Sequence, residues 1–408
     1  MTVLKGYDCD IVICGGGVIG ASLACLLGDA NFNVVLLDRE PPKKIESKAD
    51  DSRILAVTVA SERILKTTGA WSYFAEEKIS PFREMHVWDE NGDGKICFES
   101  ASICEPVMGY IIEYNVIANA LHKRISCLEN VNYISGVSPK LIKKEIDAIN
   151  IETDNGRKLK TKLLVGADGS NSVVRKLCNI NFQKHDYEQS ALTCVVTSEI
   201  EHGEIARQRF LSDGPLAFLP MKSPNKSAIV WSAKPQRIQQ LLKSNKTVFH
   251  DELTAAFGNK LGLITESSER KIFQLSRAQA DHYVQPRLAL IGDSAHTVHP
   301  LAGLGANLGL LDAASLAEVL IDTFNSGRDI GRLQVLRRYE RWRKGENLQM
   351  MYVLDGFKYL FENQFQSVQW LRNSGLDVIN DMPIVKNAIM ARAMGLNGSL
   401  PRFAKSYN

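Results

Sequence analysis

The sequence lacks paired cysteines, a large net charge and a biased composition, each of which would place it in a specialised class of protein. Its eight cysteines form no CxxC pair and no metal-ligand spacing, which argues against a disulfide framework or a structural zinc site. Its 408 residues carry a formal net charge of only +3, too little to indicate nucleic-acid binding. Hydrophobic residues (45%) and charged residues (23%) occur in the proportions usual for globular proteins. The length therefore predicts two or three domains, and the cysteine usage predicts a reducing, cytoplasmic environment.

The charge is small in total but unevenly distributed along the chain. Residues 331–408 contain 12 Lys/Arg and 6 Asp/Glu, a net of +6, which leaves −3 for residues 1–330. Apolar residues recur at helical spacing through "VLDGFKYLFENQF" (353–365), so a helical C-terminal region is expected. Core or subunit packing would account for this apolar face. Docking at a membrane or a partner subunit would also account for it, and positive charge would help there.

One long uncharged run imitates a membrane span. It covers residues 11–28, close to the length of a transmembrane helix. However, four glycines fall within six positions, Asp10 and Asp29 bracket the run, and no cluster of basic residues precedes it. Neither a membrane span nor a signal peptide is therefore predicted. Peripheral attachment to the inner face of a membrane stays open.

Residues 10–38 have the pattern of a strand, a glycine-rich turn, a helix and a second strand that ends at Asp38. In the turn, Gly15 permits the tight bend, Gly17 allows close approach of a pyrophosphate, and Gly20 allows close helix–strand packing. The helix N-terminus attracts phosphate, and Asp38 is placed to accept hydrogen bonds from a ribose hydroxyl. The pattern predicts a dinucleotide site for NAD or FAD; the alternative is a glycine-rich turn in an ordinary α/β unit.

A second glycine-rich loop, "GDSAHTVHPLAGLGANLG" (292–309), follows an apolar strand and precedes a helix. Asp293 directly follows the strand, where a carboxylate can accept hydrogen bonds from a sugar or ribityl hydroxyl. Gly303, Gly305 and Asn307 precede a helix whose N-terminal N–H groups could face the negative charge of a reduced flavin. NAD has no such requirement, so the two loops predict one FAD held at both ends.

The middle of the chain predicts a change of architecture. Residues 163–175 have the pattern of a strand, a sharp turn and a short helix, with Ser170 or Asn171 as the expected helix cap. From 182 to 273, alternating and β-branched runs predict an antiparallel sheet inserted into the dinucleotide-binding part. Phe218, Leu219 and Trp231 are candidates to line a pocket beside this sheet, with core packing as the alternative.

Taken together, these motifs resemble the flavin-dependent aromatic hydroxylases of the p-hydroxybenzoate hydroxylase type, and more narrowly the ubiquinone-biosynthesis hydroxylases. Four stretches carry the resemblance: GGGVIG (15–20), DSRILAVTVASERILKTTGAW (51–71), GADGSNSVVRK (166–176) and GDSAHTVHPLAGLGANLG (292–309). The similarity continues through "MGYIIEYNVI" and "LRRYERWRKGEN" and covers nearly the whole chain.

The resemblance implies an α/β fold, in which an FAD-binding Rossmann-like domain carries an inserted antiparallel-sheet substrate domain and a helical C-terminal region. The expected boundaries are 1–75, 100–181 and 274–330 for the FAD-binding domain, 76–99 and 182–273 for the substrate domain, and 331–408 for the helical region.

The resemblance also implies which positions contact the cofactor. They are Gly15, Gly17, Gly20, Asp38, Arg39, Arg53, Asp168, Gly292, Asp293, Pro300, Gly303, Gly305, Ala306 and Asn307. The chain departs from the family at two places. Leu304 stands where the family usually has Gln, which removes a polar group close to the flavin and makes Leu304 a further candidate for the substrate pocket. Tyr114 interrupts the ENxVI pattern that is usual in the family.

The implied activity is ring hydroxylation of a polyprenylated phenol with FAD, O2 and NAD(P)H, through a flavin hydroperoxide. The segments "IARQRF", "GPLAFLPM" and "AIVWS" are most similar to the 2-polyprenylphenol hydroxylase member, which favours the C5 position. Only one complete strand–GxGxxG–helix–acid unit is present, so a separate NAD(P)H domain is not expected. The protein supplies orientation and excludes water in such chemistry, and no acid–base residue is assigned.

Other readings remain open at this stage. The chain could hydroxylate a small soluble aromatic, or serve as a non-catalytic FAD-bound subunit of a biosynthetic complex. A homo-oligomer or a quinone-biosynthesis complex also stays open. His296 and His299 have i, i+3 spacing but no completing ligands, so a structural hydrogen bond is expected there and a metal site is not.

Overall fold

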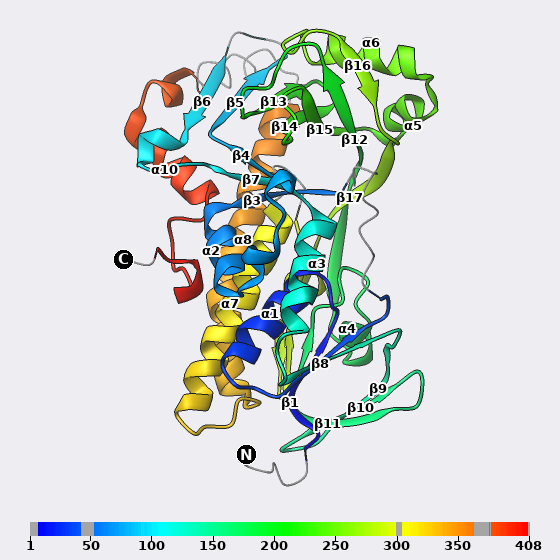
Figure 1. Ribbon diagram of the computed structural model, residues 1–408, viewed down its shortest axis with the longest axis vertical. Coiled ribbons are helices and arrows are strands. Elements are labelled where there is room, and N and C mark those ends of the chain that lie inside the picture. The colour runs from blue at the N-terminus through cyan, green and yellow to red at the C-terminus, as the bar shows by residue number, and fades with distance from the viewer. Residues whose placement is uncertain are drawn as a thin grey trace.

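The structure is a computed structural model that describes residues 7–41, 53–90, 92, 94–298, 304–362, 375 and 377–406. Two large sheets lie at opposite ends of an elongated molecule, a small sheet lies between them, and two long helices run along one side (Figure 1). The predicted α/β class and the helical C-terminal region are both confirmed.

The first sheet has eight strands in the order β18-β19-β11-β1-β2-β8, and β10 and β9 extend it beside β11. The pairings among β8, β2, β1, β11 and β19 are parallel. β1 is buried along its whole length, as expected for an apolar strand covered on both faces. The strands are β1 (Cys9–Cys14), β2 (Val34–Asp38), β8 (Val131–Ser135), β9 (Pro139–Lys144), β10 (Ile149–Thr153), β11 (Lys158–Gly166), β18 (Val284–Gln285) and β19 (Leu288–Leu290).

Helices α1 (Val18–Asp29), α3 (Tyr114–Ile125) and α7 (Leu304–Asn325) pack together beside this sheet. Nearly every residue of α1 is buried because the helix is enclosed by the sheet and the other two helices. The short helix α4 (Val173–Leu177) follows β11. Its N-cap is Ser172, whose hydroxyl accepts a hydrogen bond from the Arg175 N–H, so the prediction of Ser170 or Asn171 was wrong by one or two residues. The strand–turn–helix–strand predicted for residues 10–38 is thus present as β1, α1 and β2.

The second sheet has nine strands in the order β20-β17-β12-β15-β14-β13-β5-β6, with β16 beside β12. All its pairings are antiparallel except that of β13 with β5. The sheet extends past residue 273, because β17 continues to Ala280 and β20 joins it. Its strands are β5 (Glu84–Asp89), β6 (Lys95–Glu99), β12 (Phe182–Ser198), β13 (Ile205–Leu211), β14 (Gly214–Pro220), β15 (Lys226–Ala233), β16 (Ile264–Ser267), β17 (Lys271–Ala280) and β20 (His296–Thr297).

Helices α5 (Pro235–Lys243) and α6 (Lys246–Ala256) cover one face of this second sheet and bury a separate apolar core against it. The small sheet between the two large ones has the order β3-β7-β4, with β3 (Ile54–Thr58), β7 (Gly109–Glu113) and β4 (Ile79–Phe82). Helix α2 (Val59–Thr67) follows β3 directly. Short 3-10 turns complete the chain: η1 (Ala70–Tyr73), η2 (Glu76–Lys78), η3 (Ser100–Ile103), η4 (Gly292–Ser294) and η6 (Arg402–Ala404).

Helix α8 (Leu333–Glu362) runs along both large sheets, and α10 (Pro383–Ala393) lies near its far end (Figure 1). Leu336 and Tyr339 of α8 belong to the main core, whereas Met351 and Leu354 pack beneath the second sheet. Part of the C-terminal region therefore does pack in the core. Within the described residues, no helix is long and apolar enough to span a bilayer.

The C-terminal segment also covers the edge strand β6. The Lys95 N–H donates to the Asp377 carboxylate over 3.2 Å, and the Cys97 N–H donates to the Asn380 side-chain oxygen over 3.1 Å. Side chains thus satisfy two backbone donors that an edge strand would otherwise present to solvent or to another chain.

Candidate FAD site

The turn between β1 and α1 is built so that only backbone can occupy it. Gly15 has a φ of +110°, and a Cβ there would lie 2.2 Å from the Ala167 carbonyl oxygen. A Cβ at Gly20 would lie 1.9 Å from the Gly15 carbonyl oxygen. Gly17 is the N-cap of α1 and supplies no side-chain cap to its N–H groups. The result is a cradle of backbone donors at a helix N-terminus, which fits a pyrophosphate.

Asp38 ends β2 beside this turn. Its Oδ2 accepts a hydrogen bond from the Gly16 N–H over 2.6 Å, and its Oδ1 accepts one from the Glu40 N–H over 2.9 Å. The carboxylate is therefore held at the edge of the cradle, where a ribose would lie. Arg39 points elsewhere: its side chain is 76% exposed and lies 3.8 Å from the Glu40 carboxylate.

Tyr114 and Arg53 lie over the same helix N-terminus. The Tyr114 hydroxyl accepts a hydrogen bond from the Val18 N–H over 3.4 Å, and a Cβ at Gly17 would lie 2.8 Å from that hydroxyl. The Arg53 guanidinium carbon lies 3.8 Å from the centre of the Tyr114 ring. The departure from the ENxVI pattern thus places an aromatic ring and a stacked positive charge beside the phosphate-binding turn.

Asp168 lies across from this turn, at the end of β11. Its Oδ2 accepts hydrogen bonds from the N–H groups of Val173 and Val174, over 2.7 and 3.0 Å. Its Oδ1 is buried and has no hydrogen-bond partner in the described structure. Capping of α4 therefore uses one oxygen of Asp168 and leaves the other available to a ligand.

The GADG and GDSAH stretches are tied to each other. The Ser294 hydroxyl donates to the Gly166 carbonyl over 2.6 Å, and the Arg175 guanidinium donates to the Ser294 carbonyl over 2.9 Å. Both stretches follow neighbouring parallel strands, β11 and β19, so they meet at the same edge of the sheet. Two motifs about 120 residues apart in the sequence form one rim around the cradle.

Among residues 292–298 of the second loop, Asp293 is the exposed one. The surrounding protein desolvates its carboxylate and raises its pKa, and the nearby charges of His296 and Arg53 act in the opposite direction. The side chain nevertheless keeps an exposed surface. The loop itself turns at Gly292, whose φ is +58°. An exposed carboxylate in this position fits a sugar or ribityl hydroxyl.

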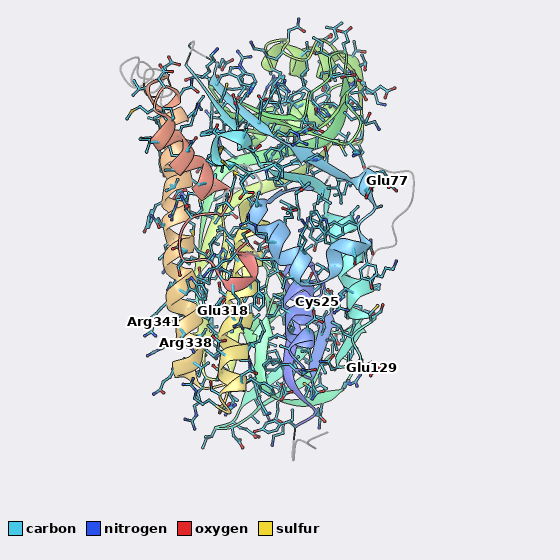
Figure 2. The ribbon with its side chains drawn as sticks, turned by 60° about the vertical axis from the view of Figure 1, so that its left-hand side comes forward. Cys25, Glu77, Glu129, Glu318, Arg338 and Arg341 are labelled. Atoms are coloured by element: carbon cyan, nitrogen blue, oxygen red, sulfur yellow. The ribbon has the colours of Figure 1, made fainter. Side chains whose placement is uncertain are left out.

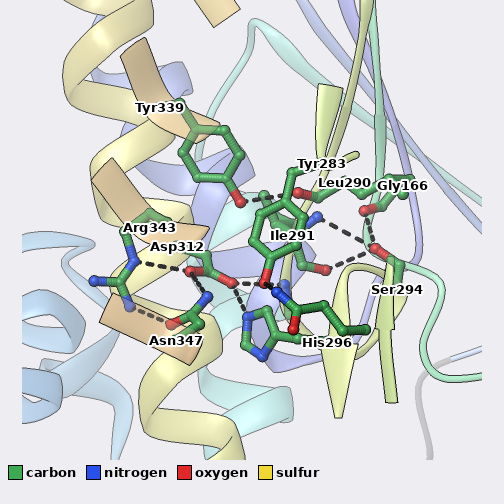
Figure 3. A network of polar contacts seen from close by, with 12 residues as sticks. Gly166, Tyr283, Leu290, Ile291, Ser294, His296, Asp312, Tyr339, Arg343 and Asn347 are labelled. Carbon is green, nitrogen blue, oxygen red and sulfur yellow. Dashed lines mark hydrogen bonds and ion pairs between the residues drawn. The ribbon is translucent and has the colours of Figure 1, made fainter. Parts of the chain in front are cut away.

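A buried charge network centres on Asp312 of α7 (Figure 3). Asp312 accepts hydrogen bonds from the Gly292 N–H (3.1 Å), His296 Nε2 (2.5 Å), Arg343 Nε (2.8 Å) and Asn347 Nδ2 (3.1 Å). Burial would raise the pKa of this carboxyl, but His296 and Arg343 outweigh it and lower the pKa to about 2. The network fastens the second loop to α7 and α8.

Sequence reasoning missed this network, although a signal was present. Asp312 is the only Asp, Glu, Lys or Arg between residues 294 and 317, in the largely apolar first part of α7. An isolated charge at such a position needs a partner, because an unpaired buried carboxylate is costly. Arg343 and Asn347 are four residues apart and so share one face of α8. The hydrogen bond of His296 agrees with the structural role expected for it.

Asn307, expected to face the flavin, is engaged by the protein itself. Its Oδ1 accepts a hydrogen bond from the Thr58 N–H over 3.0 Å, and its Nδ2 donates to the Ala56 carbonyl over 2.8 Å. It therefore joins the start of α7 to β3. Gly305 and Ala306 are half-buried in the first turn of α7, whose N–H groups lack intrahelical acceptors.

Several predicted site residues lie outside the described residues. They are His299, Pro300, Gly303 and the side chain of Leu304.

The three aromatic and aliphatic pocket candidates do not share one side of the second sheet. Phe218 and Trp231 are buried in the core beneath α5 and α6, where Phe218 stacks on Phe257 at 3.8 Å between ring centres. Leu219 alternates with Phe218 along β14, so it points to the opposite face. This placement fits core packing for Phe218 and Trp231, which the sequence had left open.

A cavity of about 160 Å³ adjoins the small sheet and the β14–β15 turn. Inside it, Lys78 forms an ion pair with Glu113 over 3.0 Å. Ile54, the residue after Arg53, forms part of its wall. Its lining residues are Ile54, Glu77, Lys78, Ile111, Glu113, Met221, Lys222, Ser223 and Lys226. Across the described ranges, no group of three His, Cys, Asp or Glu side chains is arranged to hold a metal ion.

Comparison with known proteins agrees with this geometry. The family described as "FAD binding domain" matches residues 8–350. The mitochondrial ubiquinone biosynthesis monooxygenase COQ6 of Danio rerio is 34% identical, over 94% of this chain and 89% of the relative. The 3-demethoxyubiquinol 3-hydroxylase of Escherichia coli K12 is 33% identical, over 95% of this chain and 98% of the relative. The chain belongs to this FAD-dependent hydroxylase family of ubiquinone biosynthesis.

Solved structures support the same architecture. The p-nitrophenol 4-monooxygenase PnpA from Pseudomonas putida DLL-E4 superposes with a TM-score of 0.77, covering 96% of this chain and 98% of that one. The sequence identity is 19%, so this likeness shows the fold alone. Membership of the family makes this hydroxylase an FAD-dependent monooxygenase, for which NAD(P)H is the typical electron donor.

Proposed function

We propose that this hydroxylase oxidises a polyprenylated phenol in ubiquinone biosynthesis, with the C5 ring position favoured. The observation that carries the proposal is the pair of loops joined at one sheet edge, in a chain about one-third identical to ubiquinone-pathway hydroxylases. The similarity of the segments in β13–β15 to the 2-polyprenylphenol hydroxylase member supports the C5 position.

We infer that the first glycine-rich loop binds the ADP half of FAD and that the second binds its ribityl chain. Gly15, Gly17 and Gly20 form the backbone cradle for the pyrophosphate, and Asp38 lies where the ribose would be. Asp168 offers its open oxygen, and Asp293 offers its exposed carboxylate to the ribityl chain. When bound, FAD accepts electrons from NAD(P)H and supplies the activated oxygen.

Around the bound cofactor, the protein supplies position and charge. Arg53 brings a positive charge to the helix N-terminus that faces the phosphates. Asn307 fixes the first turn of α7, and the N–H groups of that turn would stabilise the negative charge of a reduced flavin. Apolar side chains of β5, β6, β13 and α8 pack against Val298 of the second loop and Leu308 of α7, and would keep water away from this side of the site.

A polyprenylated substrate resides in a bilayer, and one surface of the protein is suited to reach it. Large apolar side chains are exposed on α8 and on residues 378–389, and we call this set the C-terminal apolar patch. Its members are Tyr352, Val353, Val378, Met382, Ile384, Val385 and Ile389. Ile384 is 87% exposed. Such a concentration exceeds what scattered surface apolar residues require, and it supports docking on a lipid surface.

The C-terminal region is basic as a whole, with a net charge of +6 over residues 331–408. Lys386 and Arg392 lie on α10 with the patch members Ile384, Val385 and Ile389, whereas Arg338 and Arg341 project from α8 nearer its start (Figure 2). A positive balance in this region favours anionic lipid. The ion pair of Arg392 with Glu346, over 3.4 Å, ties α10 to α8.

The direct test is in vitro hydroxylation. Holoenzyme would be mixed with NADH or NADPH and a polyprenylphenol in anionic liposomes, and the product analysed by mass spectrometry and NMR. A product with one additional oxygen at C5 supports the proposal, and oxygen at another carbon would correct the position. Turnover of a soluble phenol but not of the prenylated one would replace the substrate class. Bound FAD that NAD(P)H cannot reduce would favour the non-catalytic role.

A further inference from the structure

A cysteine, a histidine and a glutamate form a cluster on the outer strands of the second sheet. Cys97 of β6 is the direct cross-strand neighbour of His86 of β5, so both side chains point to the same face. Glu84, two residues before His86, shares that face. Its Oε2 lies 2.8 Å from His86 Nε2. The imidazole thus has Glu84 on one side and the Cys97 thiol on the other.

The arrangement favours the thiolate form of Cys97. A hydrogen bond from His86 lowers the pKa of the Cys97 thiol, against the opposing effect of partial burial, and Lys95 and Lys386 add positive charge. The same hydrogen bond raises the pKa of His86, and Glu84 raises it further. Both shifts stabilise a thiolate–imidazolium pair.

Two more charged groups belong to this face: Glu99 of β6, directly opposite Glu84, and Arg207 of β13, the parallel-strand neighbour of His86. Its guanidinium donates to the His202 and Ile205 carbonyls, and the Glu84 carboxylate attracts it as well. Glu84 therefore lies between two cationic groups. Lys386 of α10 lies beyond β6, where its Nζ approaches the Asn380 side chain over 3.5 Å. Cys97 itself is partly exposed.

We propose that Cys97 is a peroxide-reactive site, in which His86 serves both to hold the thiolate and to donate a proton. The Cys97 sulfur attacks one oxygen of hydrogen peroxide, an S–O bond forms and the O–O bond breaks. The sulfur is oxidised to a sulfenic acid and the peroxide is reduced. The departing hydroxide takes the proton of the His86 imidazolium and leaves as water. Nothing in this step requires FAD or the aromatic substrate.

Cys104 and Cys127 serve as internal references, because both are exposed cysteines outside the cluster. Native holoenzyme would be alkylated with iodoacetamide between pH 5 and 9, and each cysteine followed by peptide mass spectrometry. In parallel, sulfenic acid formed by added hydrogen peroxide would be trapped with dimedone. We expect Cys97 to be alkylated at lower pH than either reference, and to be trapped at least about ten-fold faster at pH 7.

The matched variant is His86→Gln, which keeps a polar side chain of similar size but cannot become a cation. It should move the alkylation midpoint of Cys97 upwards and slow dimedone trapping by about ten-fold, with both references unchanged. Unchanged references and retained FAD would show that the variant is folded. If it does not fold, Glu84→Gln offers a milder test with a smaller shift in the same direction. Alkylation of Cys97 with the pH profile of Cys104 in the unmodified protein, or a profile unaffected by both substitutions, would overturn the proposal.

Discussion

His296 Nε2 lies 2.5 Å from Asp312 Oδ2, and both side chains are almost completely buried. The contact joins the loop that carries Asp293 to the helix that follows it. Arg343 lies on the other oxygen of the same carboxylate, 2.8 Å away. One buried carboxylate therefore holds an FAD-binding loop, α7 and α8 in a fixed arrangement, and several expectations depend on it.

Replacing Asp312 with Asn should destabilise the protein strongly. The substitution removes the negative charge and leaves Arg343 buried without its counter-ion. Breaking a buried pair in this way typically costs about 3–5 kcal/mol. Urea unfolding of the two proteins measures the loss, and absorbance of the purified protein measures the FAD retained. We expect lower FAD retention, because the Asp293 loop loses its anchor.

Asp322→Asn is the matched control on the same helix. Asp322 forms an ion pair with Arg402 over 3.0 Å, but both side chains are exposed, at 41% and 44%. Such surface pairs contribute at most about 1 kcal/mol. Equal losses in the two variants would contradict a special role for the Asp312 network.

The lowered pKa of Asp312 predicts that the free energy of unfolding decreases at acidic pH. Its pKa falls from 3.8 to about 2 in the folded protein, so the folded state favours the ionised form. The resulting stabilisation is complete above about pH 4 and is lost as the pH falls through about 2. It amounts to about 2 kcal/mol. Unfolding free energies measured between pH 6 and pH 2.5 should fall more steeply for the unmodified protein than for Asp312→Asn. Parallel curves would show that another group causes the decline.

Gly20→Ala should abolish FAD binding. The added Cβ would lie 1.9 Å from the Gly15 carbonyl oxygen, and backbone cannot yield by that much without opening the turn. The control is Gly345→Ala in α8, where a Cβ meets nothing within 4 Å. There the substitution should stabilise the helix by about 1 kcal/mol. Flavin absorbance of the purified variants distinguishes the two. Full flavin content in Gly20→Ala would show that the turn at residues 15–20 does not bind FAD.

Ile384→Asp should weaken binding to anionic liposomes. It places a charge in the middle of the C-terminal apolar patch, where burial in lipid would be costly. Ile146→Asp is the control, because Ile146 is fully exposed at the β9–β10 turn, at the other end of the molecule (Figure 1). Co-sedimentation with vesicles should fall several-fold for Ile384→Asp and stay constant for Ile146→Asp. Equal binding by both variants would remove this surface from the proposed function.

Some of the site could be inferred locally and some could not. The glycines of the first turn are informative because the backbone geometry they permit is decided within a few residues. Asn307 was found by its place in a motif, but its hydrogen bonds to Ala56 and Thr58 link positions about 250 residues apart. Its side chain was therefore expected to face the cofactor, whereas the structure uses it to join α7 to β3.

Local sequence also cannot predict which face of a strand will be buried. Alternation along β14 separates Phe218 from Leu219, but it does not say which face will be covered by α5 and α6. Similarly, the sequence shows an isolated charge at Asp312 without showing that α8 will bring Arg343 to it.

The sequence by itself determined the α/β class, the strand–turn–helix units and the choice of FAD over NAD, because each rests on short-range geometry and residue chemistry. Only the tertiary structure decided how the two loops share one rim, which residues pair with Asp312, and where Tyr114, Cys97 and the C-terminal apolar patch lie. These depend on contacts between segments far apart in the chain, and such contacts follow from packing of the whole core rather than from any local pattern.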